Sequence, residues 1–193
     1  MRSLRTMDQS AYALRENTGT SGVVETARAA VSALADYDIP HLIVGGIAVQ
    51  EHGYPRVTTD VDIVVPDVLE AVDYLTANLS GPFRRVPNFE DRVQHCGNGV
   101  FVDLLPAGSV LKQGCKVPFP QPTACTAELQ LVTLEQLVSL KLDCWANSPA
   151  KRLRDKADVT ELILRRRLPR NLAVAAPVRN DYLETWDALQ AER

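Results

Sequence analysis

Residues 58–65, with the sequence TTDVDIVV, constrain the fold more than any other part of this chain. Their apolar side chains are typical of a buried β-strand, and Asp60 and Asp62 project from the same face of such a strand. Two neighbouring carboxylates on a largely buried strand repel each other, which drives their pKa values apart. A divalent cation removes this penalty, and Mg²⁺ prefers carboxylate oxygens together with substrate phosphates. The segment therefore predicts a core strand that carries a cation-binding pair of acids.

A third acid has a comparable position further along the chain. Asp103 lies between Val102 and Leu104 in a second apolar, strand-like segment, residues 100–105. An acid in the middle of a hydrophobic strand needs a partner, and the Asp60 and Asp62 pair would be one. Three acids that converge from two strands form the two-metal arrangement of phosphoryl and nucleotidyl transfer.

Gly45 and Gly46 stand where a predicted strand at 41–44 passes into a predicted helix at 47–52. Glycine allows a ligand to approach the backbone closely, and the N–H groups at the start of a helix attract phosphate. A glycine pair by itself usually marks only a turn. The acids that follow it favour a phosphate-binding role.

The other segments predict an α/β (α+β) fold in which helices lie between the strands of a small mixed sheet. Helical periodicity covers residues 21–37 and 68–79. Two strand-like segments, 92–96 and 100–105, flank Gly97-Asn98-Gly99, and Asn-Gly supplies the positive φ angles of a tight hairpin turn.

The C-terminal part predicts a helical subdomain. Thr133 and Gln136 form a capping box for a helix that runs to about residue 146. Ser148 as N-cap, with Pro149 in the first turn, predicts a second helix that reaches about residue 167. We also expect a short strand at 130–132 and a third helix at 182–191. The predicted units are a leader at 1–19 (weakly structured or a short helix), a core at 20–132 and a helical subdomain at 133–193.

The charge of the chain is unevenly distributed. The formal net charge of −3 argues against indiscriminate nucleic-acid binding, but residues 151–170 contain eight basic and three acidic side chains. Such an asymmetry suits a polyanionic ligand, although a solvated helix face is the simpler interpretation. Aromatic residues make up only 6% of the chain, which argues against recognition of single strands by base stacking. The predicted RNA-binding residues are Arg152, Arg154, Arg165, Arg166 and Arg167.

Several classes of protein are disfavoured by the sequence. No apolar run approaches the ~18 residues of a membrane span, and residues 1–20 lack the apolar core of a signal peptide. The four cysteines contain no C-x-x-C pair, so a zinc site or a thioredoxin-like motif is not expected. We therefore expect a cytoplasmic protein without a membrane partner.

These motifs together resemble a known superfamily. The pattern has three segments: Gly45-Gly46, Arg56-Val57-Thr58-Thr59-Asp60-Val61-Asp62 and Val102-Asp103-Leu104. It resembles the nucleotidyltransferase superfamily of DNA polymerase β, which shares a glycine pair, a D-x-D and a third acid. One departure is Gly46, because many members of the superfamily carry serine there. Without that hydroxyl, backbone N–H groups must contact the phosphate.

The later part of the chain is similar to AbiEii-like bacterial toxins of toxin–antitoxin systems, including the MenT group. The similar segments are Leu134-Glu135-Gln136-Leu137 with Lys141, and Arg154-Asp155-Lys156-Ala157-Asp158. The resemblance spans roughly residues 38–165. It implies an enzyme of the EC 2.7.7 type that uses two Mg²⁺ ions. The enzyme would transfer a nucleotide from an NTP, preferably a pyrimidine, to the 3′ end of tRNA. It would act as a growth-inhibiting toxin that a cognate antitoxin neutralises.

The resemblance also implies roles for individual residues. Asp60, Asp62 and Asp103 would bind Mg²⁺, with Asp103 at the second ion and near the attacking hydroxyl. Lys141 would reach the NTP phosphates, although a lysine in a helix is more often solvated. The implied catalytic residues are Asp60, Asp62, Asp103 and Lys141. The implied NTP-binding residues are Gly45, Gly46, Arg56, Lys141, Asp155 and Asp158.

Thr58 suggests a form of regulation. A period of two places it on the same face as Asp60 and Asp62, so a phosphate on its hydroxyl would add a charge of about −1.5 to −2 beside two carboxylates. We hypothesise that phosphorylation of Thr58 switches the site off, as the antitoxin is thought to do in some MenT-type systems. A β-branched strand residue with no such role is the simpler interpretation.

Two alternatives remain open at this point. The first is a nucleotidyltransferase that acts on a small molecule, as antibiotic-modifying enzymes do. Its cationic acceptors would call for an acidic pocket, which the basic segment at 151–170 disfavours. The second is a non-catalytic module with the same fold. Loss of a metal ligand would be its signature, and all three acids are present.

Overall fold

The computed structural model describes residues 21–191, so the leader predicted at 1–19 lies outside the described residues. The chain forms a five-stranded mixed sheet in the order β1-β2-β5-β4-β3, with helices on both faces, which confirms the predicted fold class. The strands are β1 (Leu42–Ile43), β2 (Asp60–Val65), β3 (Phe83–Arg85), β4 (Arg92–His95) and β5 (Phe101–Pro106). The helices are α2 (Ser21–Asp36), α3 (Gly45–Glu51), α4 (Val68–Thr76), α5 (Leu134–Asn147), α6 (Leu153–Arg166), the 3₁₀ helix η1 (Ala176–Val178) and α7 (Arg179–Ala191).

The alternation of side chains along β2 gives the sheet two chemically different faces. Val61, Ile63 and Val65 are buried in a hydrophobic cluster with residues of α2 and α4. Asp60 and Asp62 project from the opposite face, because successive side chains on a strand alternate. Helices α2 and α4 therefore cover the apolar face and leave the acids on the other.

The parallel pairing of β2 with β5 brings the third acid beside the first two. The register places Asp62 opposite Asp103 and Val61 opposite Val102. The chain between these strands forms α4, β3 and β4, and β4 then pairs antiparallel with β5. Two acids about 40 residues apart in the sequence thus occupy neighbouring positions on one face.

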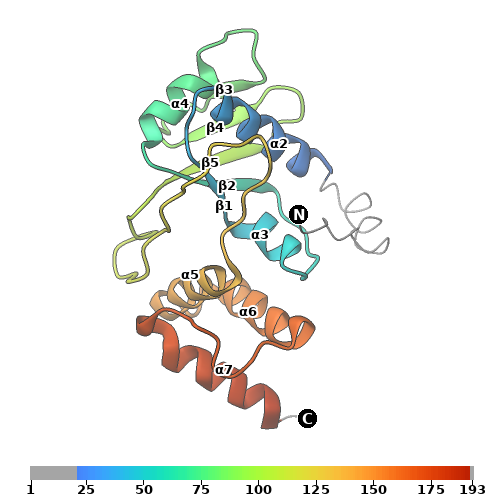
Figure 1. The fold of residues 1–193 in the computed structure, drawn as a ribbon, viewed down its shortest axis with the longest axis vertical. Helices are drawn as coiled ribbons and strands as arrows, with labels where there is room; N and C mark the ends of the chain where they lie inside the picture. The colour runs from blue at the N-terminus through green and yellow to red at the C-terminus, as the bar shows by residue number, and fades with distance from the viewer. Residues whose placement is uncertain (1–20, 192–193) are drawn as a thin grey trace.

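Helices α5, α6 and α7 gather at one end of the molecule, whereas α4 and β3 lie at the other (Figure 1). Residues of these C-terminal helices form a second hydrophobic cluster with Val44, with Ala48 and Val49 of α3, and with Val64 of β2. The helical end consequently packs against the acid-bearing side of the sheet.

The predicted hairpin exists, but its turn is longer than a tight Asn-Gly turn. β4 and β5 pair antiparallel, and residues 96–100 connect them. Gly99 has a positive φ of 74°. Asn98 uses its side chain instead, because Oδ1 accepts hydrogen bonds from the Thr26 hydroxyl and the Val100 N–H. Its Nδ2 donates to the carbonyl of Gly22, so the turn is fastened to α2.

Other predicted boundaries differ from those of the structure. Ser148 does not begin the predicted helix. It ends α5, its Oγ accepts a hydrogen bond from Lys112 Nζ at 2.8 Å, and its carbonyl accepts from the N–H groups of Lys151 and Arg152 in a turn. The next helix starts only at Leu153, after a turn. Residues 130–132 form a single parallel bridge, Ile43 to Leu131, rather than a strand. Strand β3 was not predicted from the sequence.

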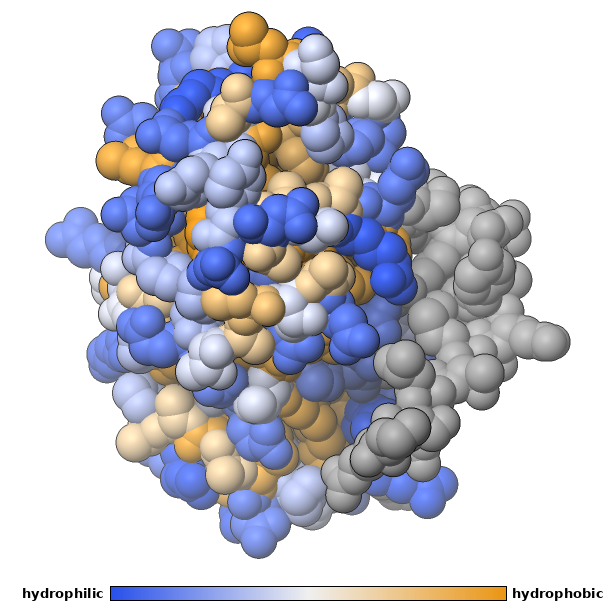
Figure 2. Space-filling model, turned by 45° about the horizontal axis from the view of Figure 1, so that its top comes forward, coloured by the Kyte–Doolittle hydropathy of each residue, from blue (hydrophilic) through white to orange (hydrophobic). Residues whose placement is uncertain are grey.

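One face of the molecule is mainly polar. Hydrophilic residues cover most of the face shown in Figure 2, with hydrophobic residues scattered among them. Among residues 21–191, the helices are too short or too polar to cross a bilayer.

The predicted capping box at Thr133 is confirmed and should contribute measurably to stability. The Thr133 hydroxyl accepts from the Gln136 N–H, and Gln136 Oε1 accepts from the Thr133 N–H. We expect Thr133→Ala to lower the free energy of unfolding by ~1 kcal/mol in urea titrations, whereas Thr133→Ser keeps the cap. Equal losses in the two variants would contradict the capping role.

Candidate active site

The three predicted acids line one cavity on the polar face of the sheet. Asp60, Asp62 and Asp103 border a space of about 360 Å³ that also reaches Lys141 on α5 and Arg152. β2 supplies two of the acids and β5 the third, so their placement follows directly from the strand register. The sheet and the C-terminal helices thus both contribute charged groups to the same space.

Burial and the charges of the neighbouring acids alter the titration of Asp62. Burial, followed by the charges of Asp60 and Asp103, raises the pKa of Asp62 from 3.8 to about 6. Lys141 and a hydrogen bond from the Gly46 N–H lower the pKa but do not compensate. The site therefore carries excess negative charge, which a divalent cation would neutralise.

The glycine pair makes room for this cluster. Gly45 has a φ of +61°, and a Cβ on it would lie 1.8 Å from Oδ2 of Asp62. A Cβ on Gly46 would lie 2.1 Å from Oγ1 of Thr58. A side chain at either position would collide with a neighbour, and the Gly46 N–H already donates to Asp62. In the structure the two glycines allow close packing around Asp62 and Thr58. The predicted contact of the glycine pair with phosphate stays a prediction.

Arg92 is a site residue that sequence reasoning missed. It lies opposite Asp103 in the pairing of β4 with β5, and it donates to both carboxylate oxygens of Asp103, with Nη2 at 2.9 Å. The hydrogen bond to Asp103, together with the negative charges of Asp103, Asp91 and Asp60, raises the pKa of Arg92 although burial opposes the shift. The alternation of side chains in residues 92–95 would place Arg92 on the acidic face. Only the register of β4 with β5 shows that its partner is Asp103.

A second cavity of about 340 Å³ adjoins the first and is lined by more basic than acidic side chains. It shares Gly45, Asp60, Asp62, Lys141, Arg152 and Asp155 with the first cavity. The basic residues on its lining are Arg56, Lys141, Lys151, Arg152 and Arg154. A cationic cavity that adjoins a cluster of acids is suited to a polyphosphate bound together with divalent cations.

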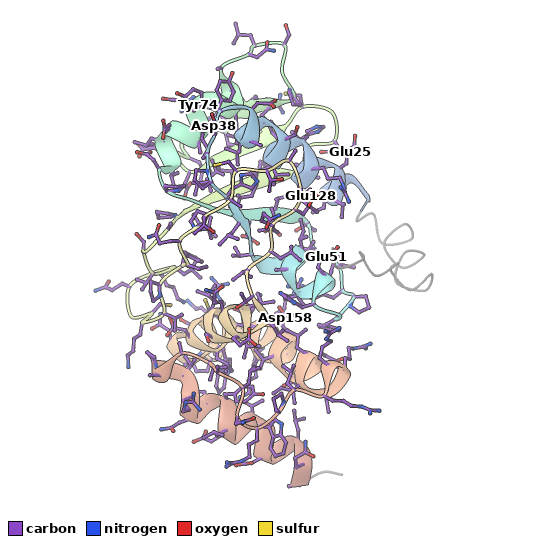
Figure 3. All side chains as sticks on the ribbon, viewed as in Figure 1. Glu25, Asp38, Glu51, Tyr74, Glu128 and Asp158 are labelled. Carbon is purple, nitrogen blue, oxygen red and sulfur yellow. The ribbon has the colours of Figure 1, made fainter. Side chains whose placement is uncertain are left out.

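A buried ionic network fixes the cationic side of the site. Asp158 on α6 accepts two hydrogen bonds from Arg56, at 2.7 and 2.9 Å, and forms an ion pair with Lys141 at 2.9 Å. Lys141 also donates to Asp155 at 2.7 Å. The Asp158 side chain is 1% exposed and lies where the helices face α3 and the sheet (Figure 3). These contacts raise the pKa of Lys141 despite its burial, so Lys141 is a fixed positive charge.

The other predicted binding residues do not lie together at one site. Asp155 lines both cavities, whereas Asp158 is fully enclosed by its ion pairs. Arg152 and Arg154 border the second cavity. Arg165, Arg166 and Arg167 lie at the opposite end of α6, ~18 Å along the helix at 1.5 Å per residue, so the five arginines do not form one surface.

Thr58 lies beside the acids, as its spacing indicated, although it precedes β2. Its hydroxyl donates to Oδ1 of Asp60 at 3.2 Å, and the residue is 6% exposed. A modifying enzyme would reach this hydroxyl only if residues 56–59 moved. Phosphorylation of Thr58 stays a prediction.

The chemistry of the three acids suits Mg²⁺, but their side chains are not positioned to hold one ion together. Within residues 21–191, no group of three or more His, Cys, Asp or Glu side chains is positioned to hold a metal ion. Asp103 directs both oxygens at Arg92 rather than at the other acids. Asp60 and Asp62 share one face, and burial together with the charges of Asp60 and Asp103 raises the pKa of Asp62. These two carboxylates are the donors that would hold Mg²⁺.

No protein-family model and no curated protein sequence matches this chain. Among solved structures, it is similar to the solution structure of the antibiotic-resistance factor ANT(2'')-Ia, with 13% sequence identity and a TM-score of 0.47. The match covers 90% of this chain and 95% of that one. A likeness of this size assigns no activity, so the function must be inferred from the residues of the site.

The raised pKa of Asp62 predicts an unusual dependence of stability on pH. The folded protein keeps this proton up to about pH 6, but the unfolded chain loses it near 3.8. Stability without divalent cations should therefore fall as pH rises through this window. We expect Asp62→Asn to be about 1–3 kcal/mol more stable than the parent at about pH 7.5 and no more stable at about pH 4. Urea unfolding in EDTA measures this, and an equal difference at both pH values would contradict it.

The network around Asp158 predicts a large loss of stability when it is broken. Asp158→Ala leaves Arg56 and Lys141 as buried charges with one fewer partner, and we expect it to cost ~3–5 kcal/mol in urea unfolding. The control is Asp187→Ala, which breaks the exposed ion pair with Arg170 at 2.8 Å. Solvent screens that pair, so the unfolding midpoint should hardly change. Similar losses in both variants would refute the structural role of the network.

Proposed function

We propose that this chain is a Mg²⁺-dependent nucleotidyltransferase. The observation that carries the proposal is the cluster of Asp60, Asp62 and Asp103 in the first cavity, with Asp60 and Asp62 also lining an adjoining cavity that has five basic and three acidic side chains. The cationic cavity suits the triphosphate of an NTP. The acids suit the Mg²⁺ that accompanies it, which would stabilise negative charge on the phosphates and lower the barrier to attack.

In the proposed reaction, the oxygen of an acceptor hydroxyl attacks the α-phosphorus of the NTP. A new O–P bond forms, the bond between the α-phosphorus and the bridging oxygen breaks, and pyrophosphate leaves with that electron pair. Asp103 accepts the hydroxyl proton. Lys141, Arg152 and Arg154 would pair with the β- and γ-phosphates, because they line the cationic cavity.

The resemblance to AbiEii-like and MenT-type toxins extends this proposal to the acceptor. We propose the 3′ end of tRNA as the acceptor, growth inhibition as the outcome and a cognate antitoxin as the partner. The exposed basic residues Lys151 and Arg154 beside the cavity support a polyanionic ligand.

One observation favours a second candidate, transfer to a small cationic acceptor. The first cavity is lined by five aspartates, Asp60, Asp62, Asp91, Asp103 and Asp155, against three basic residues, Arg92, Lys141 and Arg152. Four of these acids are needed for cations or are paired with Lys141 or Arg92, which reduces the charge available to an acceptor.

The test is incubation of the purified protein with total tRNA, Mg²⁺ and each radiolabelled NTP in turn. We expect label on tRNA from one or two NTPs and at least ~100-fold less with Asp60→Ala, because a charge-stabilising group at the reacting phosphate is lost. Asp187→Ala, an exposed aspartate on α7, is the matched control and should retain activity.

The other outcomes separate the candidates. Label on a cationic small molecule and none on tRNA would favour the second candidate. Absence of both labelling and Mg²⁺–NTP binding would overturn the enzymatic proposal.

A further inference from the structure

Two exposed aromatic rings flank the guanidinium of Arg92. Cζ of Arg92 lies 4.8 Å from the ring centre of Phe89 and 5.4 Å from that of Phe101. Phe89 is 48% exposed and Phe101 is 37% exposed. Large rings gain most by burial, so two exposed rings around a cation, beside a cluster of acids, call for a ligand that covers them.

These residues lie on the side of the acids away from the cationic cavity. A third cavity, of about 400 Å³, is lined by Arg92, Phe101 and Asp103, together with Asp60, Thr59 and residues 98–100. It shares Asp60, Arg92 and Asp103 with the first cavity but only Asp60 with the cationic one. Phe101 and Arg92 therefore line the third cavity and Phe89 and Arg92 the first, whereas none of these three residues lines the cationic cavity.

The chemistry of transfer assigns opposite sides to the two substrates. The attacking oxygen and the leaving pyrophosphate are roughly in line with the α-phosphorus, so the acceptor approaches from the side opposite the β- and γ-phosphates. If the cationic cavity holds the triphosphate, the acceptor enters past Phe89, Arg92 and Phe101. This step rests on the proposed function.

We propose that Phe89, Arg92 and Phe101 form an acceptor subsite for the last nucleotide of a single-stranded polynucleotide. The exposed rings offer faces on which a nucleobase stacks, and Arg92 offers a bidentate donor for the adjoining phosphate. A polycationic small molecule would meet the positive charge of Arg92 instead. The combination of ring and cation thus selects an acceptor that carries both an aromatic base and a negative charge.

Arg92 would also link acceptor binding to the state of Asp103. In this structure Arg92 donates to both oxygens of Asp103, the proton acceptor of the proposed reaction. An acceptor phosphate is an alternative anionic partner for the same guanidinium. When Arg92 turns to that phosphate, the Asp103 oxygens become available for the hydroxyl and for Mg²⁺.

The experiment measures binding of a 5′-labelled RNA hairpin with a four-nucleotide single-stranded 3′ end by fluorescence anisotropy. We expect Phe89→Ala and Phe101→Ala to weaken binding roughly 5- to 100-fold, the range of one lost base stack. Phe101→Tyr keeps a ring and should bind like the parent. Tyr74→Ala is the matched control, because Tyr74 is also 37% exposed but belongs to α4, which packs against the apolar face of the sheet, opposite the acids.

Two further measurements distinguish this subsite from a structural effect. A hairpin with an abasic last nucleotide should bind the parent more weakly, and Phe101→Ala should then cause no additional loss. Arg92→Gln should lower the slope of log affinity against log salt by about one charge. Mg²⁺–NTP binding should stay unchanged in the phenylalanine variants.

The outcomes separate the subsite from the enzymatic proposal. Parent-like hairpin affinity in both phenylalanine variants would overturn the subsite, even if the protein binds Mg²⁺–NTP and labels tRNA. Equal weakening by Tyr74→Ala would also overturn it. A failure of the parent to bind Mg²⁺–NTP would overturn the enzymatic proposal, whatever the hairpin does.

Discussion

The arrangement of this molecule depends on a carboxylate that is removed from water and neutralised by two cations. The charge of Asp158 can be buried because Arg56, from the segment before β2, and Lys141, from α5, both form ion pairs with it. A buried charge is tolerated when ion pairs and hydrogen bonds satisfy it almost completely. The network therefore forms only if the segments that carry Asp158, Arg56 and Lys141 are all in place. The network therefore sets the position of the helical end relative to the acid-bearing strand, and with it the shape of the cationic cavity.

Much of the fold could be predicted because its strongest signals are local. The capping box at Thr133 and the apolar periodicity of α2 and α4 depend on residues within a few positions of one another. The errors occurred where a distant residue decides the conformation. Ser148 has the pattern of an N-cap, but it ends α5, and its hydroxyl accepts a hydrogen bond from the distant Lys112. Asn98 has the pattern of a tight turn, but its side chain is bound to α2.

The same distinction holds for the candidate site. Asp60, Asp62 and Asp103 were recognisable because an acid within an apolar strand is conspicuous in any sequence. Arg92 was not, because its significance comes from the register between β4 and β5. The low aromatic content of the chain argued against base stacking, but composition does not report position. Phe89 and Phe101 matter because the fold places both beside Arg92.

The contact between Gly46 and Thr58 has a consequence for how this site can vary. Any β-carbon at position 46 would occupy the space of the Thr58 hydroxyl, which lines the same cavity. The superfamily that this sequence resembles often carries serine at the position of Gly46, and here a hydroxyl reaches the cavity from the neighbouring segment instead. Positions 46 and 58 are therefore epistatic. A serine at 46 would require the Thr58 side chain to shift or residue 58 to become smaller.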